Sequence, residues 1–121
     1  MAERARFLFQ SNHFSKANEI VRPSAFLPRN GETSVFDIVD LEDADIRSVG
    51  DDVGVARGKP PKGRGEFQYD DAESVGLAFE RDDIPPRHGN LVGWPDDGSE
   101  LKARQKAVAV ALSARAVLVL R

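Results

Sequence analysis

The residues best suited to proton transfer in this 121-residue sequence are its two histidines, His13 and His88. Two imidazoles beside an arginine can cleave a phosphodiester without a metal. One imidazole takes a proton from a hydroxyl, the other protonates the leaving oxygen, and the cation stabilises the developing charge. His13, His88 and Arg87 are therefore the candidate catalytic residues, on condition that both imidazoles face one pocket. The alternative is two independent loop histidines, each hydrogen-bonded to backbone carbonyls or water.

The segment IPPRHGNLVGWP, residues 84–95, shows neither a helix nor a strand period and contains the only tryptophan. Loops on a rigid scaffold often carry function. We therefore expect a ligand-binding site here, possible members being Arg22, Arg87, His88, Asn90 and Trp94. Trp94, between Gly93 and Pro95, can instead plug the core beneath the loop, as a lone tryptophan commonly does. Asn90 can instead serve a turn, since it tolerates a left-handed backbone.

A second candidate is the basic segment RGKPPKGRG, residues 57–65, which has three glycines, two prolines and four cations. Its spacing of glycines imitates a phosphate loop, but Pro60 and Pro61 lack the N–H groups that such a loop aims at phosphate. The sequence predicts a mobile basic loop, with an anion site as the alternative. In the second case phosphate would be bound by Arg57, Lys59, Lys62 and Arg64.

Several kinds of chemistry lack their signatures. The sequence has no cysteine, no paired histidines at metal-ligand spacing and no calcium-loop pattern, and its aspartate doublets fit turns and caps. We therefore predict no metal and no cofactor. No G-x-S-x-G occurs, which argues against a serine hydrolase built on that nucleophile turn.

Composition favours a globular, cytoplasmic protein that does not enter a membrane. Hydrophobic residues make up 40% and charged residues 31%. No signal-peptide pattern follows the N-terminus. The most apolar run, residues 107–120, is interrupted by Ser113 and Arg115 and is shorter than the roughly 20 residues that span a bilayer. Acidic and basic blocks alternate along the chain, so nucleic-acid binding is possible but not favoured.

Local patterns predict the elements that must hold these residues. Strands are expected at residues 6–10, 33–39, 66–69 and 75–80, and a short helix at 40–50 with Asp40 as its N-cap. A long C-terminal helix is expected over 99–118, although 116–120 could instead form a last strand. The prediction is one α+β domain over 1–121. Its small antiparallel sheet of four or five short strands packs against the long C-terminal helix, and one short helix is added.

The sequence contains no complete catalytic pattern, but it does contain an elaborate loop over residues 84–95. We therefore expect a small intracellular binding module that recognises a partner protein or an anionic ligand through residues 84–95, as a monomer or a homodimer. The alternative is a metal-independent, His-dependent ribonuclease or phosphoryl-handling enzyme, so whether the protein is an enzyme stays open.

Overall fold

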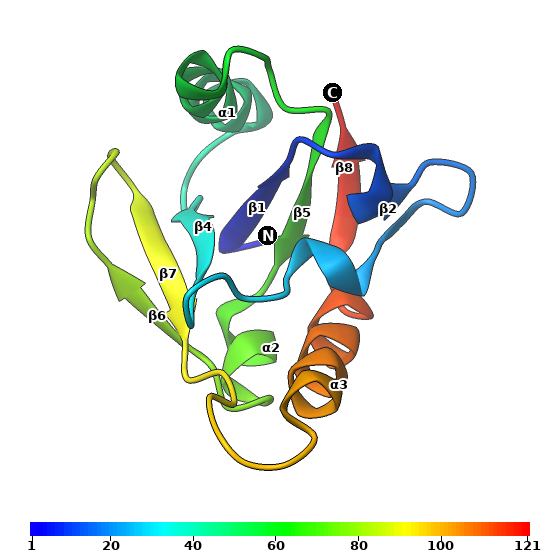
Figure 1. The fold of residues 1–121 in the computed structure, drawn as a ribbon. Coiled ribbons are helices and arrows are strands. Elements are labelled where there is room, and N and C mark those ends of the chain that lie inside the picture. The colour runs from blue at the N-terminus through cyan, green and yellow to red at the C-terminus, as the bar shows by residue number, and fades with distance from the viewer.

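A computed structural model describes residues 1–121 as an α+β fold built on an antiparallel sheet of six strands, in the order β6-β7-β4-β1-β5-β8 (Figure 1). The strands are β1 (Arg4–Leu8), β4 (Thr33–Asp37), β5 (Gly63–Phe67), β6 (Ala78–Arg81), β7 (His88–Val92) and β8 (Val117–Leu120). A separate hairpin pairs β2 (Phe14–Ser15) with β3 (Ile20–Val21). The helices are α1 (Asp43–Arg57), α2 (Tyr69–Glu73) and α3 (Leu101–Ser113), with short 3-10 helices η1 (Ser11–His13) and η2 (Pro23–Ala25).

The sheet buries apolar side chains on both faces because β1 is apolar at successive positions. Ala5, Phe7 and Phe9 point to the side of α1, where they pack with Phe36, Ile38 and Ile46. Leu8 points to the other side, into a larger cluster with residues of β4, β5, β7, α2 and α3. Figure 1 shows α1 on one side of the sheet and α2 and α3 on the other. The central strand is thus held between two cores.

Helix α1 differs from the predicted helix in both of its bounds. Asp40 has a left-handed backbone with φ of 63°, and the N-cap is Glu42, which forms a capping box with Asp45. The helix passes Gly50 and ends only at Arg57. Gly50 does not stop it because the missing side chain makes room: a Cβ there would lie 2.7 Å from the ring of Phe7. This glycine permits close packing of α1 on β1.

The predicted mobile loop 57–65 is wrong in extent. Arg57 is the last residue of α1, β5 begins at Gly63, and only residues 58–62 connect the two. Arg64 is a buried strand residue that donates hydrogen bonds to Asp43 (2.6 Å) and Glu66 (2.7 Å). The two glycines that flank Arg64 permit close strand packing, since a Cβ on Gly63 would lie 2.8 Å from the carbonyl oxygen of Val119.

The number of strands exceeds the prediction because the segment 84–95 contains β7. Within β7, His88 and Asn90 share one face while the buried Gly89 and Leu91 share the other. Gly89 has no side chain, and the ring of Phe79 on β6 fills that space, 2.5 Å from where a Cβ would lie. Half-buried and buried residues do alternate along β7, but the sequence hides this pattern because one of the two buried positions is a glycine.

The C-terminal helix is shorter than predicted, because α3 ends at Ser113 and residues 117–120 form the edge strand β8, paired antiparallel to β5. Its N-cap position, Glu100, has a left-handed backbone and no side-chain capping bond. The alternative of a final strand near 116–120 is therefore the correct one. No helix in the structure has the length and apolar character that crossing a membrane requires.

Candidate functional site

The sheet opens between β1 and β4, and this opening makes the candidate site. The two strands pair only at Arg4–Asp37 and Ala5–Phe36, whereas β1 stays paired with β5 as far as Leu8. Beyond Ala5 the side chain of Arg6 takes the place of backbone pairing. Its Nε donates to the carbonyl of Ala25 and its Nη1 to the carbonyl of Ser34, each at 3.0 Å. A charged side chain therefore stands where a strand ladder would otherwise continue.

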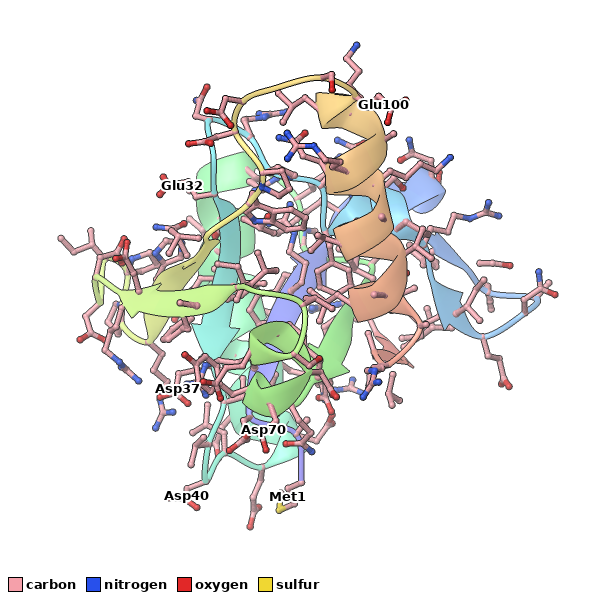
Figure 2. All side chains as sticks on the ribbon, turned by 90° about the horizontal axis from the view of Figure 1, so that it is seen from below. Met1, Glu32, Asp37, Asp40, Asp70 and Glu100 are labelled. Carbon is pink, nitrogen blue, oxygen red and sulfur yellow. The ribbon has the colours of Figure 1, made fainter.

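A cavity of about 460 Å³ lies at this opening. It is at the Glu32 end of β4, the end opposite Asp37 in Figure 2. This volume falls within the range typical of small-molecule sites. The lining side chains are mostly polar and come from β1, η1, η2, the loop before β4, β4 itself, α1 and β7. They are Arg6, Phe7, Phe9, Gln10, His13, Ser24, Leu27, Pro28, Arg29, Asn30, Glu32, Thr33, Ser34, Arg57 and Asn90.

Positive charge dominates the cavity. Arg6, Arg29 and Arg57 line it together with His13, and Glu32 is the only carboxylate. Burial, together with the charges of Arg57 and Arg29, lowers the pKa of Arg6 to about 10. Burial and the charge of Arg6 likewise lower the pKa of His13 below its usual value. Both shifts mean that positive charge on these two side chains costs free energy in the folded protein.

The three cavity arginines differ from most others in this chain because none of them pairs with a carboxylate. Six other arginines form ion pairs: Arg4, Arg47, Arg64, Arg81, Arg115 and Arg121. Arg6 donates to backbone carbonyls, and Arg57 lies over the ring of Phe9, 4.3 Å from its centroid. No carboxylate therefore forms an ion pair with these three arginines, although Glu32 lines the same cavity.

His88 makes a second polar cluster beside the cavity. Its Nε2 lies 2.6 Å from the hydroxyl of Ser34, and its Nδ1 lies 2.7 Å from Oδ1 of Asp82. The ring also packs edge-on against Phe36, with centroids 5.2 Å apart. The pKa of Asp82 is lowered by the N–H of Ile84 and by His88. Ser34 lines the cavity and His88 does not, so this hydroxyl connects the two clusters.

The structure places the sequence candidates in different settings. Asn90 and His13 line the cavity, and so does Arg57 of the basic segment. Arg87 donates to the carbonyls of Asp37 and Val39, where it fastens the β6–β7 connection. The exposed Arg22 donates to the carbonyl of Phe14. Trp94 is 5% exposed and lies in the larger core, its Nε1 donating to the carbonyl of Leu91. The interpretation that fits this position is a core plug.

The basic segment is divided in the same way. Lys59 and Lys62 are exposed and do not line the cavity, while Arg64 is paired with Asp43 and Glu66. The shared anion site proposed for Arg57, Lys59, Lys62 and Arg64 is therefore not assembled. Arg57 shares the cavity instead with Arg6 and Arg29. Neither Arg6 nor Arg29 stands in a segment whose composition marks it as basic.

Histidine and carboxylate side chains do not gather in groups of three or more that could hold a metal ion. Comparison of the chain with protein-family models, with curated proteins and with solved structures gives no match in any of the three. The geometry of the cavity is therefore the basis for the proposals below.

Proposed function

We propose that this protein binds a small phosphate-bearing ligand in the cavity between β1 and β4. The observation that carries the proposal is the convergence of Arg6, Arg29 and Arg57 on one cavity with no carboxylate paired to any of them. Guanidinium groups match the oxygen geometry of phosphate and bind it through paired N–H donors. Burial lowers the pKa of Arg6 most, and the charges of Arg57 and Arg29 add to this effect; a dianion would offset that repulsion.

The lining also supports a ligand larger than a free anion. Gln10, Asn30 and Asn90 offer amide groups around the cationic centre, and Phe7 and Leu27 offer apolar surface. A cavity of about 460 Å³ accommodates a phosphorylated molecule with an organic part. Recognition of an anionic ligand was one of the two partner classes expected from sequence. The proposal moves it from the 84–95 segment to the arginine cavity, where Asn90 is the residue of that segment that takes part.

Isothermal titration with inorganic phosphate and with nucleoside monophosphates tests this function. We expect saturable binding that weakens with added chloride, and a loss of about tenfold or more in Arg57→Gln and in Arg29→Gln, because each removes a charge-assisted hydrogen bond. Arg104→Gln is the matched control. Arg104 is an exposed arginine of α3 that does not line the cavity and whose guanidinium donates to backbone carbonyls. Equal weakening in all three variants, or no saturable binding, would overturn the proposal.

The alternative of phosphodiester cleavage by two histidines is tested with the same protein. His13 lines the cavity but His88 does not, which favours binding over a two-histidine mechanism. Wild type, His13→Ala and His88→Ala are incubated with labelled RNA in EDTA, and circular dichroism checks that each is folded. Cleavage that both substitutions abolish would replace the binding proposal with the ribonuclease.

A further inference from the structure

Three side chains at the edge of the cavity have the connectivity of a nucleophile, a base and a group that orients the base. The hydroxyl of Ser34 lies 2.6 Å from Nε2 of His88, and Nδ1 of the same ring lies 2.7 Å from Asp82. With Nδ1 protonated towards the carboxylate, Nε2 is left free to accept the proton of Ser34. We propose that Ser34 is a nucleophile activated by His88 and Asp82, and that the cavity hydrolyses a carboxylic ester bearing an anionic group.

The sheet itself sets this geometry. Ser34 pairs with Asn90 and Phe36 pairs with His88 across β4 and β7, so Ser34 and His88 are diagonal neighbours on one face. A diagonal pair on adjacent antiparallel strands is within reach of a long or aromatic side chain. The imidazole cannot swing freely, because Phe36 packs against its ring. The base is therefore positioned by two adjacent strands of the sheet.

Asp82 is held in turn by the connection between β6 and β7. The N–H of Ile84 donates to its Oδ1 at 3.0 Å, so the same oxygen accepts from backbone and from imidazole. The carbonyl of His88 accepts from the N–H groups of Asp82 and Asp83, which joins the two ends of the connection. These bonds keep Asp82 ionised and directed at Nδ1. In a relay of this kind the carboxylate fixes the tautomer and stabilises the imidazolium that forms.

Ser34 also has access to a substrate and has donors beside it. Ser34 is among the residues that line the cavity, and Asn90, directly opposite in the strand pairing, lines the same cavity. Arg6 donates to the carbonyl of Ser34. The amide of Asn90 is the group available to stabilise an oxyanion formed at Ser34. Preorganised donors of this type contribute much of the rate enhancement in acyl transfer.

The chemical step balances without a further reactant except water. Oγ of Ser34 bonds to the carbonyl carbon of the ester while its proton moves to Nε2 of His88. The bond from that carbon to the alcohol oxygen then breaks, and the leaving oxygen takes the proton from Nε2. Water attacks the acyl-serine, again giving its proton to Nε2. The acid is released, and Ser34 recovers its hydrogen.

The choice of an anionic ester rests on the proposed function, because the cavity arginines would hold its charged group. The nucleophile does not rest on it, and the test makes the two separable. Purified protein is treated with a fluorophosphonate in the absence of any added anion, and the adduct is located by intact mass and peptide mapping. If phosphate does not bind, labelling of Ser34 still supports the nucleophile. If Ser34 is not labelled, phosphate binding still supports the proposed function.

We expect one adduct, on Ser34, formed about a hundredfold or more slowly in His88→Gln and more slowly than wild type in Asp82→Asn. Ser24 is an internal control: it lines the same cavity, but its hydroxyl donates to the carbonyl of Asn12, and it should stay unmodified. Ser48→Ala, on the exposed face of α1, should label at the wild-type rate.

Because His88→Gln could disturb the β4–β7 pairing, each variant is first checked by its thermal midpoint, and Asp82→Asn provides a second, exposed substitution. The low-field proton resonance of Nδ1 should be present in the wild type and absent from Asp82→Asn. Absence of a Ser34 adduct in the folded wild type would overturn the proposal. Equal labelling of Ser34 and Ser24, or an unchanged rate in both the His88 and Asp82 variants, would do the same.

Discussion

Arg6 on β1 and Ser34 on β4 are joined by a single side chain-to-backbone hydrogen bond of 3.0 Å, at the point where the two strands stop pairing. The guanidinium also satisfies the carbonyl of Ala25. One residue therefore closes the sheet against η2 and also places a positive charge inside the cavity. Its structural and electrostatic contributions oppose each other, because burial and the neighbouring arginines lower its pKa to about 10.

Replacing Arg6 by methionine is expected to destabilise the fold although it removes repulsion. Two carbonyls lose their donor, which costs about 1–3 kcal/mol for each buried group left unpaired. Arg57→Met removes the same charge but no carbonyl partner, and loses only a cation–π contact worth roughly 0.5–1 kcal/mol. Urea unfolding should show a clear loss for Arg6→Met and little change for Arg57→Met. Equal losses would mean that the charge of Arg6, rather than its hydrogen bonds, determines its contribution.

The ion pair between Arg64 and Asp43 should make the protein sensitive to acid. Arg64 holds the pKa of Asp43 below its usual value by hydrogen bonding and charge, with Arg47 adding to the effect. Because the folded pKa is depressed below the unfolded value, the stabilisation is complete above pH 3.8, the unfolded value, and is lost as the pH falls through the folded pKa. Asp43→Asn should therefore unfold at a midpoint that depends less on pH below about 4 than the wild type does.

The same pair predicts a loss at neutral pH for Arg64→Met. Arg64 is 6% exposed and donates to both Asp43 and Glu66. Removing two charge-assisted bonds from a buried donor should lower the free energy of unfolding by roughly 1.5–3 kcal/mol. Lys62→Met, at an exposed position two residues before Arg64, is the control and should change the free energy of unfolding little. An Arg64→Met variant as stable as the wild type would contradict the structural importance of the pair.

Local patterns predicted the α+β class and four of the sheet strands, but they missed β7 and misplaced the bounds of the helices, for physical reasons visible at single residues. Gly50 and Gly54 interrupt the helical pattern of α1, yet neither ends the helix. Each is a place where another part of the chain comes too close for a side chain. Arg64 is charged and stands between two glycines, so composition marks it as loop. Its partners Asp43 and Glu66 make burial in β5 possible, and a partner 21 residues away is invisible to a local pattern.

The candidate site was predicted only in part for a similar reason. The local sequence pointed to His13, His88, Asn90 and Arg57 as chemically capable residues, but their meeting depends on the register of β4 with β7 and on the opening beside β1. Ser34 has no sequence setting that marks it as a nucleophile. Asp82 resembles any other turn aspartate. Arrangements of this type are recognised by geometry and role rather than by sequence order, so these two residues could be found only from coordinates.

Gly54→Ala should destabilise the protein even though alanine favours helix over glycine by about 1 kcal/mol. A Cβ at this position would lie 2.6 Å from the backbone carbonyl oxygen of Lys59, which cannot move aside without displacing the turn after α1. Overpacking of this kind costs about 1–3 kcal/mol. Ala56→Gly, at an exposed position of the same helix, measures how much helix propensity alone contributes to the free energy of unfolding. Chemical unfolding of both variants checks the prediction, and stabilisation by Gly54→Ala would contradict the close approach.

Trp94 should report on the core and not on the ligand. It is buried, its Nε1 donates to the carbonyl of Leu91, and it does not line the arginine cavity. We expect blue-shifted emission that phosphate leaves unchanged, and a red shift on unfolding. Trp94→Phe should lower stability, because a buried indole N–H bond and part of a large apolar contact are lost, while phosphate affinity stays at the wild-type value. A phosphate-dependent emission change would return Trp94 to the ligand site.

His13 should couple anion binding to proton uptake. Burial and Arg6 lower its pKa from the usual value of 6.5, so the unfolded chain binds more protons just below that pH, and stability falls as the pH is lowered through this window. A bound anion favours the imidazolium and reverses the shift. Sulfate is the suitable probe because it does not titrate between pH 5 and 8. Its affinity should rise by about three- to tenfold from pH 7.5 to 5.5.

The groups that share the cavity with His13 decide how this titration is interpreted. Arg6, which lowers the pKa of His13, has a pKa of about 10 and so keeps its charge throughout this range. His13→Asn should bind sulfate with an affinity independent of pH, and buffers of different ionisation enthalpy should reveal proton uptake in the wild type alone. Glu32→Gln separates the contribution of the one cavity carboxylate. If the pH dependence disappears in Glu32→Gln and persists in His13→Asn, the coupling belongs to the carboxylate and not to the imidazole.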